Sequence, residues 1–234
     1  MMPETGPGAE RNKFHKADFC VVGGGMAGLC AAIAAARQGI RTVLVQDRPV
    51  LGGNASSEIR MWICGAHGEN NHETGIIEEL LLENMWRNTA PSYSIWDSIL
   101  YEKARFQENL VLLLNTPIHV VLTEGSRIRA VLGRQMTTEI FHTIHADLFA
   151  DCSGDGFLGA QAGADYRVGR ESRGTHGESI APETGDRKTM GMSCLIQARE
   201  TDRPQKFIPP AWAYRYDNDG TLPNREHTLT GDQN

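Results

Sequence analysis

The stretch FCVVGGGMAG, residues 19–28, decides the fold of this chain. Its first four residues are typical of a buried strand, and the three consecutive glycines predict a tight turn into a helix that begins near Ala27. Gly23 permits the turn, Gly25 lets the backbone approach a phosphate group, and Gly28 lets the helix pack closely on the strand. The free N–H groups and the dipole at the helix start favour a bound anion. The stretch therefore predicts the pyrophosphate cradle of a dinucleotide cofactor, and with it a redox enzyme.

The residues after this turn complete a strand–helix–strand unit. A helix is predicted over residues 27–38, because alanines dominate the segment and Gly39 is a natural stop. A second strand is predicted over residues 40–46, where Val43-Leu44-Val45 form the continuous apolar run of a buried parallel strand. The alternative is a glycine turn with a purely structural role. The strand before and the strand after favour the dinucleotide site.

The end of the second predicted strand normally carries a carboxylate that binds the ribose hydroxyls, roughly 20 residues beyond the glycines. In this chain that position falls on Gln46, with Asp47 next to it. A glutamine amide oxygen can accept a hydrogen bond from a hydroxyl group. Asp47 would restore the charge if the backbone turned one residue later, or it is a solvated loop charge. Both residues are therefore candidates for the ribose contact.

The rest of the chain predicts a mixed α/β fold. Amphipathic helices are expected over residues 75–87 and 94–106, and a short helix over residues 157–162. The further predicted strands cover residues 110–114, 118–122, 128–134, 139–144, 148–152 and 190–198. Turn signals separate several of these strands, which indicates an antiparallel meander, at about residues 116–150, that returns to the parallel sheet.

Charge and hydropathy exclude several classes of partner. The net charge is −6, and no basic stripe suggests nucleic-acid binding. No apolar run is long enough to span a membrane, and the polar start of the chain lacks the apolar stretch of a signal peptide. We therefore expect a cytoplasmic protein that acts on a small molecule and binds neither nucleic acid nor membranes.

The cysteines form no recognisable framework. The chain has five of them, at Cys20, Cys30, Cys64, Cys152 and Cys194. Their odd number and the lack of any C-x-x-C pair argue against disulfides and against a zinc or iron–sulfur site. No metal site is predicted.

Three features beyond the glycine turn carry a resemblance to a known family. Leu51-Gly52-Gly53 follows the second predicted strand, a meander interrupts the parallel strands, and ADCSGDG at residues 150–156 is similar to an Asp-Ala-Thr-Gly-Asp-Gly return motif. With residues 23–58, they resemble FAD-dependent oxidoreductases of the glutathione-reductase type. The similarity is greatest to the subgroup of flavoproteins that are like the A component of heterodisulfide reductase. It covers about residues 17–170.

The resemblance implies FAD as the cofactor and a set of contacts to it. Gly23, Gly25 and Gly28 would hold the pyrophosphate, and Gln46 or Asp47 would meet the adenosine ribose. The other implied contacts are Gly52 and Gly53 in the loop, backbone groups of Ile118 toward the adenine, and Gly154 and Asp155 where the chain re-enters the sheet.

This chain departs from the family pattern at two positions. The usual ribose-binding glutamate is Gln46, and the threonine of the return motif is Ser153, which keeps the hydroxyl group. Some relatives carry 4Fe-4S clusters, but the chain has no cysteine motif that could ligate one.

The resemblance also implies a division of the chain. We expect a disordered tail over residues 1–16, an FAD-binding domain over residues 17–165, and a partial substrate domain or disordered C-terminus over residues 166–234. The family's C-terminal part, which closes over the flavin, has no counterpart here, so a fragment of a longer protein is expected. The predicted fold is a Rossmann-like FAD/NAD(P)-binding domain with an inserted antiparallel meander and the start of a second, substrate domain.

The loop over residues 61–73, MWICGAHGENNHE, is the best candidate for chemistry. His67 or His72 could act as a general base while hydride leaves a substrate. Cys64 could be redox-active if its thiolate were stabilised. The alternative is that these side chains only pack or hydrogen-bond the loop.

These observations predict hydride transfer between a small molecule, which the sequence does not identify, and a flavin. An NAD(P)-dependent dehydrogenase is the first alternative, disfavoured by Leu51-Gly52-Gly53 and the meander. The second is a truncated, non-catalytic remnant of a flavoenzyme. The sequence does not define the oligomeric state.

Overall fold

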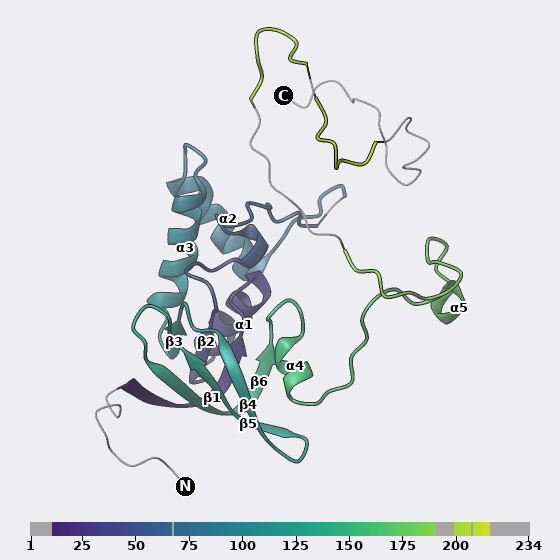
Figure 1. The fold of residues 1–234 in the computed structure, drawn as a ribbon. Helices are drawn as coiled ribbons and strands as arrows, with labels where there is room; N and C mark the ends of the chain where they lie inside the picture. Colours follow the sequence, from purple (N-terminus) through teal and green to yellow (C-terminus); the bar gives the residue numbers. More distant parts are fainter. Residues whose placement is uncertain (1–10, 67, 191–198, 207, 216–234) are drawn as a thin grey trace. The chain divides into compact units, whose positions relative to one another are not determined.

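The computed structural model describes residues 11–66, 68–190, 199–206 and 208–215 (Figure 1). The chain divides into two units, Met1–Met192 and Ser193–Asn234. The described residues of the second unit form turns and bends without a helix or strand. Most of the strand predicted over residues 190–198 lies outside the described residues.

The first unit is built on one six-stranded sheet, which confirms the predicted α/β fold. Its strand order is β3-β2-β1-β6-β5-β4. β3, β2, β1 and β6 run parallel, and β5 and β4 continue the sheet in antiparallel pairing. The strands are β1 (Asn12–Val22), β2 (Thr42–Val45), β3 (Leu110–Leu113), β4 (Ile118–Glu124), β5 (Arg127–Arg134) and β6 (Phe141–Asp151).

The helices connect the parallel strands and follow the sheet. They are α1 (Met26–Arg37), α2 (Gly75–Arg87), α3 (Tyr93–Arg105), α4 (Phe157–Gln161) and α5 (Arg173–His176). α1 joins β1 to β2, and α2 and α3 follow β2 and precede β3 along the chain (Figure 1). The predicted bounds of α2 are confirmed, and those of α1 and α3 differ by one residue at each end.

The core lies on both faces of the sheet, because successive strand residues point to opposite sides. On one face, Val21 and Leu44 pack with buried residues of α1, α2 and α3, among them Ile33 and Leu100. On the other face, Val22 and Val45 pack with residues of the elements β5, β6 and α4. These residues are Val131, Ile144 and Leu158. The parallel strands are therefore covered on both sides, as their continuous apolar sequence predicts.

Two predictions were wrong in part: the disordered tail over residues 1–16, and the separate strands over residues 139–144 and 148–152. β1 begins at Asn12, so residues 12–16 lie in the sheet and not in a disordered tail. Their side chains are mostly exposed and polar, but their backbone pairs with β6 from Phe141 onward. β6 is one strand over residues 141–151, where the sequence predicted two, because its pairing with β1 extends along its whole length.

Candidate cofactor site

The glycine turn joins the end of β1 to the start of α1, and two of its glycines are required by the protein's own packing. Gly23 has a φ of 106°, in the left-handed region that favours glycine. A Cβ atom at Gly23 would lie 2.1 Å from the carbonyl oxygen of Cys152. A Cβ atom at Gly28 would lie 1.9 Å from the carbonyl oxygen of Gly23. Neither position has room for a side chain.

Gly25 differs, because the space beside it is open. The atom nearest to a Cβ placed there is the Cα of Gly53, 4.0 Å away. Gly25 is the N-cap of α1, which has no side-chain hydrogen bond at this end and no acidic residue in its first turn. The first N–H groups of a helix have no intrahelical partner, and the helix dipole favours negative charge there. These features fit a pyrophosphate group, which would approach the backbone at Gly25.

Gln46 ties the glycine turn to the loop after β2. Its side chain is buried, with 4% exposed. Its Oε1 accepts a hydrogen bond from the N–H of Gly24 at 2.7 Å, and its Nε2 donates to the carbonyl oxygen of Val50 at 3.1 Å. The oxygen retains a second lone pair for a ribose hydroxyl. Asp47 beside it is exposed, so both candidates for the ribose contact stay open.

The loop glycines Gly52 and Gly53 lie directly against the turn. The N–H of Gly52 donates to the carbonyl oxygen of Gly24 at 2.8 Å. A Cβ at Gly53 would lie 3.1 Å from the Cα of Gly25. Both have positive φ, 105° and 58°, so the chain turns here into a short 3-10 helix, Gly53–Ala55. Gly52 and Gly53 thus lie beside the open position at Gly25.

The return motif follows β6 and reaches the other side of the turn. The N–H of Cys152 donates to the carbonyl oxygen of Val22 at 2.8 Å. Gly154 and Asp155 are exposed in the bend that follows, and Gly154 has a φ of 86°. The hydroxyl of Ser153 accepts a hydrogen bond from the N–H of Phe157 at 2.9 Å. The retained hydroxyl group therefore stabilises the start of α4.

Asp151 supports this bend from the last position of β6. Its Oδ1 accepts hydrogen bonds from the N–H and the hydroxyl of Ser153, and its Oδ2 accepts one from the N–H of Gly159 at 2.8 Å. Burial raises the pKa of Asp151, but the hydrogen bonds outweigh it and the net pKa is lowered. The carboxylate is thus held ionised by the loop that it organises.

Ile118 begins β4, and the loop before it packs against the ribose candidates. The N–H of Thr116 donates to the carbonyl oxygen of Gln46 at 2.9 Å. The N–H of Asn115 donates to the carbonyl oxygen of Arg48 at 3.1 Å. Sequence reasoning missed Thr116, which is fully buried. A threonine between a strand and a proline gives no signal of such a contact.

The structure describes two of the three catalytic candidates, Cys64 and His72, and their contacts are with other residues. Cys64 is exposed, and its Sγ lies 4.0 Å from the carbonyl oxygen of Trp62. The Nε2 of His72 lies 3.9 Å from the Oε1 of Glu78 on α2, and both side chains are exposed. His67 lies outside the described residues. A catalytic role for these side chains stays a prediction.

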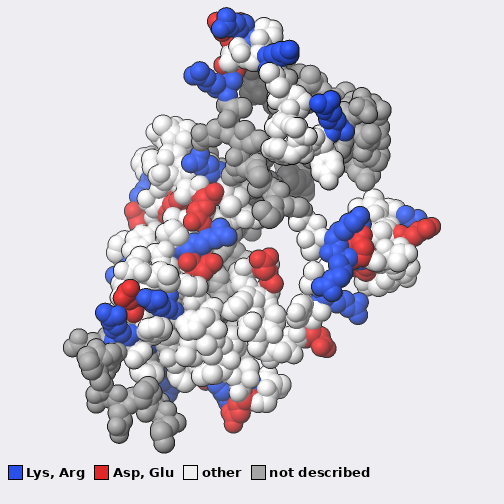
Figure 2. Space-filling model, in the orientation of Figure 1, with Lys and Arg blue, Asp and Glu red and all other residues white. Residues whose placement is uncertain are grey.

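Charge is mixed on the surface drawn in Figure 2, where acidic and basic side chains lie next to one another over the helices. Ion pairs link α2 to its neighbours, including Arg37–Glu79 and Lys103–Glu79. In the part of the chain that the structure describes, no three His, Cys, Asp or Glu side chains are grouped to hold a metal ion. Within the same residues, no helix has the length and apolar character that crossing a membrane requires.

A parallel sheet, a glycine turn at its carboxyl edge and an open position at a helix start are the arrangement of dinucleotide-binding proteins. The comparison with protein families agrees with this class and narrows it. The model of the FAD dependent oxidoreductase family matches residues 18–229. The chain therefore belongs to the FAD dependent oxidoreductase family.

Similar solved structures include a halogenase and two dehydrogenases. The myxobacterial chondrochloren halogenase is 19% identical, with a TM-score of 0.46 and coverage of 67% of this chain and 41% of that one. The glycerol-3-phosphate dehydrogenase from Bacillus halodurans complexed with FAD is 15% identical, with a TM-score of 0.42. The match covers 63% of this chain and 36% of that one. The L-proline dehydrogenase from P. horikoshii is 20% identical, with a TM-score of 0.38. The match covers 61% of this chain and 23% of that one. The chain thus spans less than half the length of each of these proteins, and similarity at this level does not define its activity.

Proposed function

We propose that this chain binds FAD at its glycine turn and takes part in hydride transfer between a small-molecule substrate and the flavin. The observation that carries the proposal is the open position at Gly25, beside a helix start without a cap or acidic residue. Membership of the FAD dependent oxidoreductase family supports FAD as the dinucleotide. Bound FAD supplies the redox chemistry, and the protein supplies binding, orientation and electrostatics.

The two ends of the proposed site have different tasks. The N–H groups at the start of α1 would bind the pyrophosphate, and Gly53 would let the loop approach it. At the adenosine end, Gln46 or Asp47 would bind the ribose, and backbone groups of Ile118 would meet the adenine. Gly154 and Asp155 would lie near the cofactor on the other side of the turn.

The loop over residues 61–73 is our proposal for the reacting side chains. His67 or His72 would take the substrate proton as hydride leaves, because the unprotonated nitrogen of a neutral imidazole can accept a proton. Cys64 is the weaker candidate, since a thiol needs a stabilised thiolate to react.

A titration of the purified chain with FAD tests the proposal. We expect bound flavin to be retained through gel filtration and to show the visible absorbance of a flavoprotein. Gly25→Ala would place a methyl group in the phosphate space, so FAD affinity should fall at least about 10-fold. Its Tm should stay near that of the parent chain, because the new methyl group would meet no residue from elsewhere in the described chain closer than 4.0 Å.

Gly174→Ala is the matched control, because the nearest atom to its Cβ is the Oγ of Ser172 at 3.9 Å and it lies on α5, which is not part of the turn. FAD affinity should be unchanged in this variant. Failure to bind FAD under any loading condition, or retention of NADH in its place, would overturn the proposal.

A further inference from the structure

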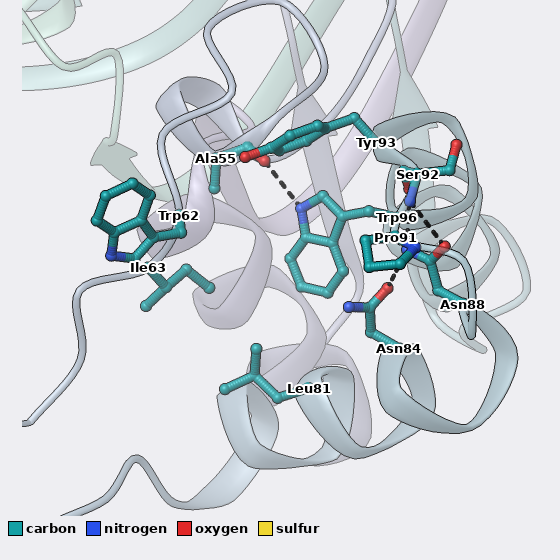
Figure 3. Close-up of a pocket in the computed structure, with 10 residues that line it drawn as sticks. All are labelled: Ala55, Trp62, Ile63, Leu81, Asn84, Asn88, Pro91, Ser92, Tyr93 and Trp96. Carbon is teal, nitrogen blue, oxygen red and sulfur yellow. Dashed lines mark hydrogen bonds between the residues drawn. The ribbon is translucent and has the colours of Figure 1, made fainter. Parts of the chain in front are cut away.

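A pocket of about 240 Å³ lies where α2 and α3 meet the segment of residues 55–63 (Figure 3). It is separate from the glycine turn, although the 3-10 helix Gly53–Ala55 borders both. α3 leads into β3, so its first residues lie toward the edge of the sheet where the parallel strands end. Ligands of open α/β sheets bind beyond this edge. The pocket therefore lies in a region where ligands of this fold bind.

The aromatic walls of the pocket are fixed by hydrogen bonds to the backbone. The indole N–H of Trp96 donates to the carbonyl oxygen of Ala55 at 2.9 Å, and this side chain is 6% exposed. The hydroxyl of Tyr93 donates to the carbonyl oxygen of Arg60 at 2.7 Å. Because their polar groups are satisfied elsewhere, both rings offer apolar surface to the pocket. Trp62 lines the opposite side and is 69% exposed (Figure 3).

The hydrogen bonds around Asn88 determine which way the amide of Asn84 faces. The N–H of Ser92 donates to Oδ1 of Asn88, so the Nδ2 of Asn88 is the atom that reaches the carbonyl oxygen of Ser92 and Asn84. The atom of Asn84 that meets this donor must be its oxygen. Its Nδ2 therefore faces the other way, toward Leu81 and Ile63 in the pocket (Figure 3). It has no hydrogen-bond partner among the described residues.

The lining defines the chemistry that the pocket accepts. None of the ten lining residues is charged, so an ionic ligand would lose its hydration without a counter-charge. The Nδ2 of Asn84 can donate a hydrogen bond to an acceptor on a ligand. A cavity of about 150 Å³ with apolar walls is large enough for benzene. The pocket therefore has room for one ring with a small substituent.

We propose that this pocket binds a small neutral molecule made of one apolar ring and a carbonyl group. The ring packs on Trp62 and Trp96, and the carbonyl oxygen accepts a hydrogen bond from the Nδ2 of Asn84. This site goes beyond the proposed function, because binding here does not require FAD.

Benzamide is the probe, with benzoate as the charged analogue and toluene as the analogue without an acceptor. Binding is followed by ligand-observed NMR, with and without added FAD. We expect saturable binding of benzamide in the millimolar range and at least about 10-fold weaker binding of benzoate. Asn84→Leu should weaken benzamide about 3- to 10-fold and leave toluene unchanged, since one hydrogen bond is lost.

Trp62→Ala should weaken both benzamide and toluene, because both rings lose their contact with the indole. Trp86→Ala is the matched control, since this tryptophan lies on α2, is 83% exposed and does not line the pocket. Equal benzamide affinity in Asn84→Leu and the parent chain, or in Trp62→Ala and the parent chain, would overturn the proposal. Benzamide binding by a chain that fails to take up FAD would contradict the proposed function and support this site.

Discussion

The Nε2 of His15 on β1 lies 2.8 Å from the Nδ1 of His142 on β6, so two imidazoles meet between paired strands. His142 is buried, and its Nε2 has no partner among the described residues. Burial, followed by the charges of His15 and Lys13, lowers the pKa of His142 to about 4. Burial and then Lys13 also lower the pKa of His15. The folded protein therefore holds this pair in its neutral form.

This pair predicts a loss of stability in weak acid. The unfolded chain takes up protons near pH 6.5, whereas the folded chain resists them down to about pH 4 for His142. The free energy of unfolding should therefore fall as pH decreases from 6.5 to 4. Urea denaturation across this range should show a smaller fall in His142→Gln than in the parent chain. His145→Gln, an exposed position on the same strand, is the control, and an identical fall in all three proteins would contradict the prediction.

The two hydrogen bonds of Gln46 predict the effect of a glutamate at this position. In Gln46→Glu, the side chain still accepts from Gly24 but can no longer donate to the carbonyl oxygen of Val50. A buried carboxylate would then face a carbonyl oxygen, which costs about 1–3 kcal/mol of unfolding free energy. Urea denaturation measures the change, with exposed Asp47→Asn as the control. A Gln46→Glu chain as stable as its parent would show that the loop rearranges freely.

We expect the substitution Gly28→Ala to cause a folding defect and not a binding defect. A methyl group there would lie 1.9 Å from the carbonyl oxygen of Gly23 and 3.0 Å from the Cβ of Cys152. The backbone must shift to relieve this contact, so we expect Gly28→Ala to lose about 3 kcal/mol or more. Thermal unfolding by circular dichroism measures the loss. Gly174→Ala serves again as the control, and a parent-like Tm for Gly28→Ala would contradict the close approach of α1 to β1.

The ion pairs of Glu79 should make a small, salt-dependent contribution to the free energy of unfolding. Hydrogen bonds from Arg37 and then Lys103 lower the pKa of Glu79 to about 2, so its stabilisation is present above pH 4.5 and is lost as pH falls toward 2. These side chains are partly exposed, and Glu79→Gln should cost about 0.5 kcal/mol at low salt. In 1 M NaCl the cost should shrink, because salt screens the pairs. Glu108→Gln is the exposed control. A cost that is independent of salt would rule out the ionic origin.

The sequence predicted the parts of the fold in which local patterns and tertiary packing agree. The glycine turn, α1 and β2 have clear apolar and glycine signals, and the bounds of α2 follow its amphipathic period. Residues 12–16 were missed because their place in the sheet comes from backbone pairing with β6, which their mostly polar and exposed side chains do not indicate.

The sequence predicted the glycines of the candidate site, but it did not predict the polar contacts there. Spacing alone placed Gly25 at the helix start, but the two hydrogen bonds of Gln46 depend on where Val50 lies in a folded loop. The orientation of the Asn84 side-chain amide depends on hydrogen bonds that involve Asn88 and Ser92. No residue pattern encodes such relationships, because they arise between segments that are brought together only in the folded chain.

The contact between Gly23 and Cys152 has a consequence for the order of folding. In the sequence the glycine turn looks like a local motif, finished within a few residues of its first strand. In the folded protein its first glycine packs on the backbone carbonyl of Cys152, which directly follows β6 and lies more than a hundred residues later. Closing a contact of such separation is slow and follows the nearer ones. On the ribosome, the cradle therefore cannot take its final shape until Cys152 has left the exit tunnel, so nascent chains shorter than this should lack a complete nucleotide site.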